Sequence, residues 1–257
     1  MGSDFYVEVG AFLRRWYWRL RREPVSIFAA LAQPVLWLFL FGNLFRRAGV
    51  AATAGGDYLA FMTAGVVVMT IVNAALAGGI EVMFDREQGL LARLLAAPIR
   101  PASVLVGRFL FVVIVTSLQA GVILAMARLM GVRPATGLPG VAGVLAIGVL
   151  LGAGVAVLSL SLAFRLRTHG EFFELIAFIS LPLLFLSSAL VPLEAMPGWM
   201  AAVARLNPMT YAIDAVRSLM LRGWATGLLA GVAGVLVLFD AVCLAIGVRT
   251  FSRALRD

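Results

Sequence analysis

The sequence contains no lysine, and only one cysteine and one histidine occur among its 257 residues. Without lysine the chain cannot form a Walker A phosphate-binding loop or a Schiff base with a carbonyl cofactor. The lone Cys243 excludes an internal disulfide, and the lone His169 leaves few side chains for a zinc site. We therefore expect no cofactor in this chain.

Charged residues are scarce as well. They make up 13% of the chain, whereas hydrophobic residues make up 62% and the mean hydropathy is +1.01. A soluble fold of this length and composition would expose far too much apolar surface. The chain is therefore expected to be an integral membrane protein, and we expect no nucleic-acid partner.

Six apolar stretches are long enough to cross a bilayer as helices of about 20 residues. Segments rich in glycine, proline or charge separate them, such as "GVRPATGLPG" at residues 131–140. The sequence thus predicts an all-α membrane protein with a single transmembrane domain over residues 1–257. The expected spans are residues 25–45, 58–80, 103–129, 141–164, 173–190 and 224–248.

An amphipathic segment precedes the first span. Residues 5–22 place apolar side chains on one helical face and several arginines on or near the other. Such a helix lies on an anionic membrane leaflet, with lipid as its partner. A plain positively charged flank of the first span would occupy the same location.

The arginines are distributed unevenly over the connections between spans. With the N-terminus in the cytoplasm, about twice as many arginines lie on the cytoplasmic side as on the outer side, which follows the positive-inside rule. The sequence therefore predicts a multi-pass protein of the inner (plasma) membrane. Both termini and residues 82–98 are expected in the cytoplasm.

The segment "VMFDREQGLLARLLAAP", residues 82–98, is charged although it lies between two apolar spans. On a helical wheel its apolar side chains gather on one face, and Pro98 ends the pattern. Glu87 falls on that face, where a carboxylate facing lipid would be costly. The pattern favours an amphipathic helix over residues 84–97 that contacts a protein partner. A membrane-surface connector without a partner has the same pattern.

Residues 191–222 are too polar and too rich in proline for a simple span. Pro192, Pro197 and Pro208 prevent one continuous helix, because proline lacks the backbone N–H and clashes with the preceding turn. The remaining pieces are helical in pattern but too short to cross a bilayer. We expect two re-entrant half-helices over residues 194–221, and a surface loop with amphipathic turns is the alternative.

This outer element would enter the outer leaflet and return, so its aromatic residues belong at interfacial depth. Asp214 and Arg217 are three residues apart on one half-helix and can pair. The residues expected to form an outer gate are Pro192, Met196, Pro197, Trp199, Asn207, Pro208, Tyr211 and Arg217.

Two of these stretches resemble a known family. "FDREQGLLARLLAAPIRPASVLVGR" (84–108) is similar to the first cytoplasmic loop of ABC-2 type transporter permeases, the membrane subunits of ATP-driven exporters. "LPLLFLSSALVPLEAMPGWMAAVARLNPMTYAIDAVRSLML" (181–221) is similar to a signature of the same family, especially in its daunorubicin-resistance, or multidrug, and nodulation-exporter branches. The order and spacing of the six spans agree, so that the resemblance covers nearly the whole chain.

The resemblance implies a non-catalytic permease that forms the substrate pathway as a homodimer. Two copies of a separate cytoplasmic ATPase would bind ATP and magnesium and drive it. Residues 84–97 would be the coupling helix on the ATPase, with a smaller contact from residues 165–171. The residues implied in coupling are Phe84, Asp85, Arg86, Glu87, Gly89, Leu91, Leu94, Arg167 and His169. Relatives handle amphipathic drugs, lipid-like molecules and lipid-linked glycans, and the substrate stays open among these.

Two other classes fit parts of the sequence. An ion-coupled secondary transporter would use Asp240 and Glu174 as ion sites. An intramembrane enzyme would need a serine nucleophile and a base in one cavity, but the only histidine lies in an expected loop. Among the uncharged polar residues inside spans, Asn73 and Gln119 are expected to form hydrogen bonds between helices.

Overall fold

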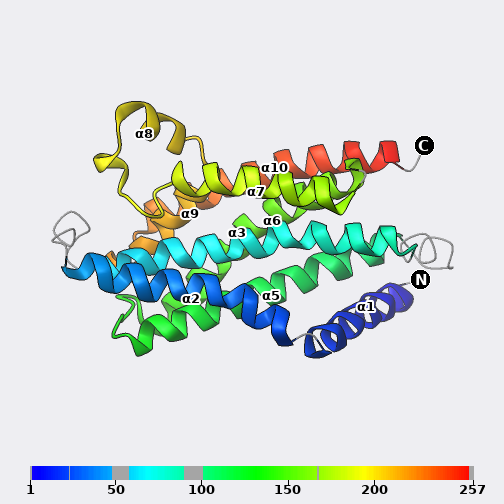
Figure 1. The fold of residues 1–257 in the computed structure, drawn as a ribbon, viewed down its shortest axis with the longest axis horizontal. Coiled ribbons are helices and arrows are strands. Elements are labelled where there is room, and N and C mark those ends of the chain that lie inside the picture. The colour runs from blue at the N-terminus through cyan, green and yellow to red at the C-terminus, as the bar shows by residue number, and fades with distance from the viewer. Residues whose placement is uncertain (1, 23, 48–57, 90–100, 167, 255–257) are drawn as a thin grey trace.

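The computed structural model describes residues 2–22, 24–47, 58–89, 101–166 and 168–254, and these residues form helices and turns with no strand. The all-α prediction is therefore confirmed. The elements, most of which are labelled in Figure 1, are α1 (Gly2–Arg22), α2 (Pro24–Arg47), α3 (Tyr58–Glu87), α5 (Pro101–Leu129), α6 (Gly137–Arg165), α7 (His169–Phe185), a 3-10 turn (Leu193–Ala195), α8 (Gly198–Ala204), α9 (Pro208–Arg217), a π-helical turn (Ser218–Arg222) and α10 (Thr226–Ala254).

Four helices in the described part of the chain are long and apolar enough to cross a membrane, namely α3, α5, α6 and α10. They correspond to four of the expected spans, which supports a multi-pass membrane protein. At the other two expected spans, α2 has 24 residues and α7 has 17. The count of six spans therefore stays a prediction.

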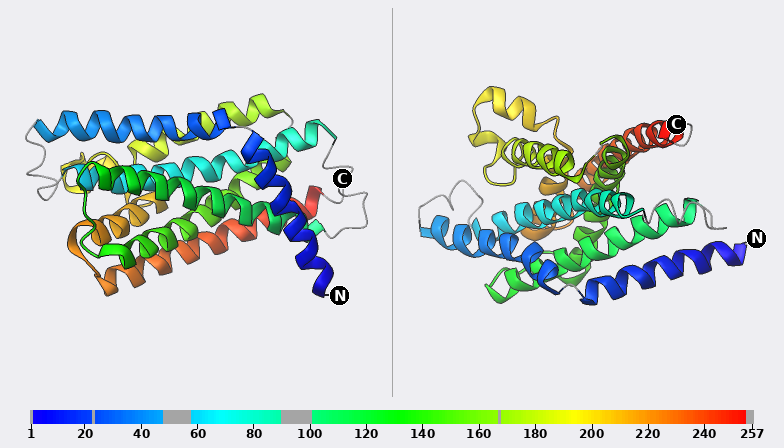
Figure 2. Two further views of the ribbon diagram at one scale, coloured as in Figure 1. Left: turned by 90° about the horizontal axis from the view of Figure 1, so that it is seen from below. Right: turned by 45° about the vertical axis from the view of Figure 1, so that its right-hand side comes forward.

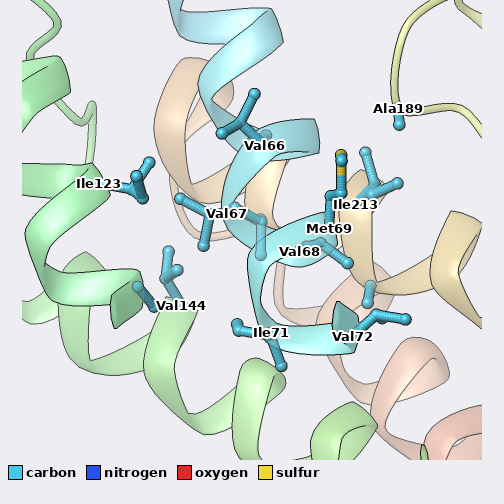
Figure 3. Packing of buried hydrophobic residues seen from close by; sticks show 14 of the residues in the cluster. Val66, Val67, Val68, Met69, Ile71, Val72, Ile123, Val144, Ala189 and Ile213 are labelled. Carbon is cyan, nitrogen blue, oxygen red and sulfur yellow. The ribbon is translucent and has the colours of Figure 1, made fainter. Parts of the chain in front are cut away.

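Helix α3 is the central element of the fold. It contacts α2, α5, α6, α7 and α9, and every side chain from Tyr58 to Val72 is buried. In Figure 3, Val67 lies toward Ile123 of α5, whereas Met69 lies toward Ile213 of α9. A helix that is covered on all sides has no polar face, which explains why this stretch is apolar without a helical period.

Two glycines allow other segments to approach α3 closely. A Cβ placed on Gly79 would lie 2.6 Å from the backbone oxygen of Ser159 in α6 and 2.6 Å from the ring of Phe172 in α7. A Cβ on Gly65 would collide with the backbone carbonyl of Ala189. Small residues at helix contacts have this effect in membrane proteins.

Helix α1 packs against α5, and in the left view of Figure 2 it runs across the direction of the long helices. Phe12 and Trp16 are buried, and Trp16 stacks on Phe111 with 5.5 Å between ring centroids. Gly107 of α5 leaves room for Phe12. We expected this apolar face to lie on lipid, but its middle part packs on protein. Tyr17 and Trp18 are among the exposed residues of α1.

The first turn of α1 and the last turn of α10 lie at the same end of the molecule, as Figure 1 shows, together with the last turn of α3 and the first turn of α7. Helix α8 lies at the opposite end. The side of the membrane on which the termini lie stays a prediction.

Candidate functional site

Three consecutive residues at the end of α3 each bind a different helix. Asp85 pairs with α1, Arg86 binds the end of α6, and Glu87 binds the first residue of α7. We call residues 84–89 the α3 terminus. Up to Glu87 it belongs to the continuous helix α3, whereas the sequence predicted that the span ends at residue 80 and that an amphipathic helix covers residues 84–97. Between residues 80 and 88 no glycine or proline interrupts the helix. Residues 90–97 of the predicted helix lie outside the described residues.

Arg86 caps the end of α6. Its Nη1 donates to the backbone carbonyls of Ala163 and Leu166 at 3.4 and 3.2 Å. The last carbonyls of a helix have no partner within the helix, and the helix dipole makes this end negative. The Arg86 guanidinium donates hydrogen bonds to these carbonyls and carries a positive charge, so it stabilises the end of α6 and fixes it to α3.

Glu87 binds the N-terminus of α7. Its carboxylate accepts the backbone N–H of His169 at 3.0 Å and lies 2.8 Å from the ring Nδ1 of the same residue. Because a carboxylate only accepts, this Nδ1 carries the proton. The ring of Phe84 stacks on the imidazole with 5.1 Å between centroids. Glu87 thus holds both the backbone and the side chain of His169.

The same contacts determine the charge of Glu87, which lies beyond residue 80, where the expected span ends. The hydrogen bond from the His169 side chain, followed by that from its backbone, lowers the pKa of the Glu87 carboxyl below its usual value. Negative charge is also favourable at a helix N-terminus. Glu87 therefore stays ionised at neutral pH.

A second set of charges fixes α1 beside the α3 terminus. Asp85 lies 3.4 Å from Arg15 of α1. Arg108 of α5 is almost fully buried, pairs with Glu81 of α3 and donates to a backbone carbonyl of α3 at 3.0 Å. Its guanidinium also lies 3.9 Å from the ring centroid of Trp16 in α1. Arg108 therefore binds α1 and α3 at once.

The rest of the predicted coupling set is only partly described. Gly89 has a φ of +68° and ends α3 with a turn that glycine adopts without strain. The other predicted coupling residues are Leu91, Leu94 and Arg167, which lie outside the described residues. The structure thus brings Phe84, Asp85, Arg86, Glu87 and His169 together at one end of the molecule.

At the opposite end, Asn207 joins α9 to the end of α7. Its side-chain oxygen accepts the N–H of Met209 at 3.0 Å and caps α9. Its amide donates to the carbonyls of Leu183 and Leu186 at 2.9 and 2.7 Å. Pro208 follows as the first residue of α9, a position that proline favours. One side chain therefore satisfies groups at two helix ends.

Arg217 ends α9 and is buried among polar partners. It lies 3.3 Å from Asp214 and donates to the Ser188 carbonyl at 2.7 Å. Its guanidinium lies 3.6 Å from the ring centroid of Phe61 in α3. The Ser188 hydroxyl donates to Asp214 at 2.9 Å. The expected Asp214–Arg217 pair is present, and it fixes α9 to α3 and to the segment after α7.

The other predicted gate residues surround α8. Pro192, Met196 and Pro197 flank the 3-10 turn that leads into this helix. Trp199 is 69% exposed, and the Tyr211 hydroxyl donates to the backbone at the end of α8 at 2.8 Å. Prolines therefore separate the short helices here, as the sequence predicted.

The ionisable residues of the ion-coupled alternative do not form one site. Asp240 of α10 lies against Gly154 of α6, where a Cβ would collide with its carboxylate. Glu174 is exposed on α7. Neither residue lines the cavity of about 970 Å³ that lies between α2, α3, α5 and α7. His169 is bound to Glu87, so it is not placed as a base for a serine nucleophile.

Some residues of these clusters carried no distinct signal in the sequence. Arg15 and Arg108 look like ordinary positive residues near membrane ends, yet they bind Asp85 and Glu81. Ser159 looks like a scattered polar residue of a span, yet it accepts the Gly79 N–H at 3.0 Å. The sequence shows which residues of one helix are three or four positions apart and can therefore contact each other. The contacts of Arg15, Arg108 and Ser159 join different helices, so this spacing does not reveal them.

The fold and these clusters define a helical multi-pass membrane protein in which charged side chains bind the ends of neighbouring helices. A sequence model of the ABC-2 type transporter family matches residues 7–221. The chain therefore belongs to the ABC-2 type transporter family, and it is a transmembrane permease subunit of an ABC transporter. Membership of this family also implies cooperation with an ABC ATPase.

Individual relatives agree with this assignment. The chain is 38% identical over 82% of its length to a putative transport permease, ycf38, of Porphyra purpurea, covering 72% of that protein. It is 30% identical over 77% of its length to the daunorubicin resistance ABC transporter permease protein DrrB1 of Streptomyces coeruleorubidus, covering 69%. It is 28% identical over 76% of its length to nodulation protein J of Rhizobium meliloti, covering 74%.

Proposed function

We propose that this chain forms the substrate pathway of an ATP-driven exporter as a homodimer. Two copies of a separate cytoplasmic ATPase bind ATP and magnesium and supply the energy. The substrate is an amphipathic drug, a lipid or a lipid-linked glycan, because related permeases are named for drug resistance and for nodulation. The protein lies in the inner membrane with both termini in the cytoplasm.

The observation that carries this proposal is the set of contacts at the α3 terminus. Residues 90–100 follow this terminus directly, and α3 is the central helix of the fold. Asp85, Arg86 and Glu87 connect its last turn to α1, α6 and α7. A displacement that an ATPase applies to residues 84–97 therefore reaches three other helices through direct bonds as well as α3 itself.

The outer end of the molecule provides the complementary part of the mechanism. Asn207 and Arg217 hold α9 against the end of α7 and against α3. A movement of α3 or α7 is thus passed to the half-helices α8 and α9. In this proposal these half-helices close the exit, and they open it when the contacts at the other end change.

Reconstitution with and without a co-expressed ATPase tests the exporter. We expect transport in proteoliposomes to require ATP and the ATPase. Glu87→Ala is expected to leave the protein inserted and dimeric, to weaken ATPase binding and to lower transport, since it releases α7 from the α3 terminus. Glu174→Ala is the matched control, because it removes an exposed carboxylate from α7. Unchanged transport and assembly with Glu87→Ala would overturn the coupling role.

Reconstitution in proteoliposomes also distinguishes the exporter from an ion-coupled transporter. The positions of Asp240 and Glu174 do not favour that alternative, since neither lines the large cavity. Uptake driven by a proton gradient without ATP, and abolished by Glu174→Ala, would replace the exporter by an ion-coupled transporter.

Cysteine labelling tests the orientation. In a Cys243→Ala background, Gln88→Cys is expected to be unreactive toward an impermeant reagent in intact cells, whereas Leu206→Cys is expected to react. Gln88 lies at the exposed end of α3, and Leu206 is 84% exposed between α8 and α9. The reverse pattern would invert the topology.

A further inference from the structure

A cavity of about 970 Å³ lies over one face of α3. Helices α2 and α5 form one wall and α7 forms the other, and all three contact α3. In Figure 1, α3 is visible between α7 above and α2 with α5 below. The volume is at the upper end of the range typical of pockets for small molecules.

The wall of this cavity is mostly apolar, and so is its rim. Leu118 of α5 and Leu181 and Phe185 of α7 line the cavity and are 56%, 60% and 50% exposed. These exposed side chains belong to two helices on opposite walls. An apolar rim in a membrane protein admits a ligand from the surrounding lipid rather than from water.

Three amides line this apolar wall: Gln33 of α2 is exposed, and the other two lie deeper. Asn73 projects from the middle of α3 and Gln119 from the middle of α5, and both line the cavity. The sequence predicted that they would hydrogen bond between helices. In the described part of the chain, no hydrogen bond joins either amide to another residue. Gln119 is buried and Asn73 is half-buried. An amide that faces an apolar space without a partner is costly, so a bound molecule with hydrogen-bonding groups would stabilise both.

The cavity carries no net charge among its described lining residues. Glu81 and Arg108 are the only ionisable ones, and they form an ion pair with each other. Arg108 also binds the Gly78 carbonyl and the Trp16 ring, so its charge is directed away from a ligand. A charged group placed beside the amides would therefore lose its hydration without gaining a counter-ion.

We propose that this cavity binds an amphipathic molecule whose apolar body fills the space between α5 and α7 and whose uncharged hydroxyl or amide group bonds to Asn73 and Gln119. The inference rests on the proposed transport function, and it narrows the substrate to amphipathic molecules that are uncharged at this depth. An anionic lipid-linked substrate does not fit here. A second copy of the chain would leave both amides without partners unless it brought polar groups to them.

Binding is tested on the purified full-length permease in phosphatidylcholine nanodiscs, without ATPase or ATP. Trp37 lines the cavity, so that a brominated ligand in the site quenches its fluorescence. The probes are three dibrominated C18 amphiphiles that differ in the head group: a neutral monoacylglycerol, an anionic alkyl sulfate and a cationic alkyl trimethylammonium. We expect saturable quenching by the neutral probe that disappears in Trp37→Phe, and at least tenfold weaker binding of both charged probes.

Substitutions locate the polar contact. Asn73→Leu and Gln119→Met are each expected to weaken the neutral probe about fivefold, which corresponds to one neutral hydrogen bond of about 1 kcal/mol. Thr116→Val is the matched control, because Thr116 is a buried polar residue of α5 that bonds to its own helix and does not line the cavity. Asn73→Asp keeps the size of the side chain and is expected to shift the preference toward the cationic probe.

Three results would overturn the inference: no saturable quenching of Trp37, equal binding of the anionic and neutral probes by the unaltered protein, or an effect of Thr116→Val as large as that of Asn73→Leu. The first two need no variant in the cavity amides, so a folding defect cannot obscure them. ATP-driven transport without probe binding would refute only this site. Probe binding without ATP-driven transport would refute only the exporter.

Discussion

Glu87, the last residue of α3, accepts hydrogen bonds from both the backbone N–H and the ring Nδ1 of His169, the first residue of α7. The two residues are 82 positions apart in the chain. Next to Glu87, Arg86 binds the end of α6. Adjacent residues of opposite charge therefore meet the two helix ends whose dipoles they complement.

The first prediction concerns the start of α7. Glu87→Ala removes the acceptor of the His169 N–H, so we expect faster hydrogen–deuterium exchange in residues 169–172. Mass spectrometry of the purified protein measures this exchange. Glu174→Ala removes a carboxylate from the same helix without this contact and is expected to leave the exchange unchanged. Equal exchange in the two variants would show that Glu87 does not hold α7.

The second prediction concerns pH. The pKa of Glu87 is lowered in the folded protein from its ordinary value of 4.5, so ionised Glu87 stabilises the fold above that value. The contribution is lost as the pH falls through the lowered pKa. We expect the thermal unfolding midpoint of the unaltered protein to exceed that of Glu87→Gln at pH 6, and the difference to close in strongly acidic solution. A difference that grows as the pH falls would contradict this linkage.

The third prediction concerns the close contact of α3 with α6 and α7. Gly79→Ala places a Cβ 2.5 Å from the Ser159 hydroxyl and 2.6 Å from the Phe172 ring, so the helices must separate. We expect a cost of about 1 to 3 kcal/mol, typical of overpacking, measured by denaturant unfolding. Gly121→Ala is the control, because no atom lies within 4 Å of its added Cβ. A similar loss in both variants would assign the effect to helix propensity instead.

The fourth prediction concerns Asn207, which joins α9 to the end of α7. Asn207→Ala removes the cap of α9 and both bonds to the end of α7, and we expect a loss of about 2 kcal/mol in the free energy of unfolding. Asn207→Ser keeps a capping oxygen, so its free energy of unfolding is expected to lie between that of the unaltered protein and that of Asn207→Ala. If Asn207→Ser is as unstable as Asn207→Ala, the bonds to Leu183 and Leu186 provide most of the stability and the cap provides little.

The sequence predicted those features that depend on neighbouring residues of the chain. Prolines and the Asn207–Pro208 step separate the short helices α8 and α9 as predicted, since proline removes a backbone donor whatever surrounds it. The Asp214–Arg217 pair was likewise visible, because residues three apart in a helix share a face. The length of the apolar stretches predicted α3, α5, α6 and α10, because a helix that crosses a bilayer needs about 20 apolar residues.

What remained hidden depends on contacts between helices. The pattern of residues 5–22 identifies an apolar face but does not distinguish lipid from the surface of α5, where Trp16 packs. Because residues 82–98 are charged, the sequence predicted that the span ends at residue 80 and that an amphipathic helix covers residues 84–97. Helix α3 instead continues to Glu87, and its last three residues bind other helices. Asn73 and Gln119 were correctly placed inside helices, but only the structure assigns them to a cavity wall.

The shortness of α7 has a consequence for the membrane around it. Its 17 residues extend about 26 Å at 1.5 Å per residue, a few ångströms less than a hydrocarbon core of about 30 Å. On the proposed topology the bilayer therefore thins beside α7, or the chain after Phe185 fills the difference. Hydrophobic mismatch of this kind makes a protein responsive to acyl-chain length. Lipid thickness thus acts on α7, which meets the Glu87 contact at its first residue and the Asn207 contact at its end.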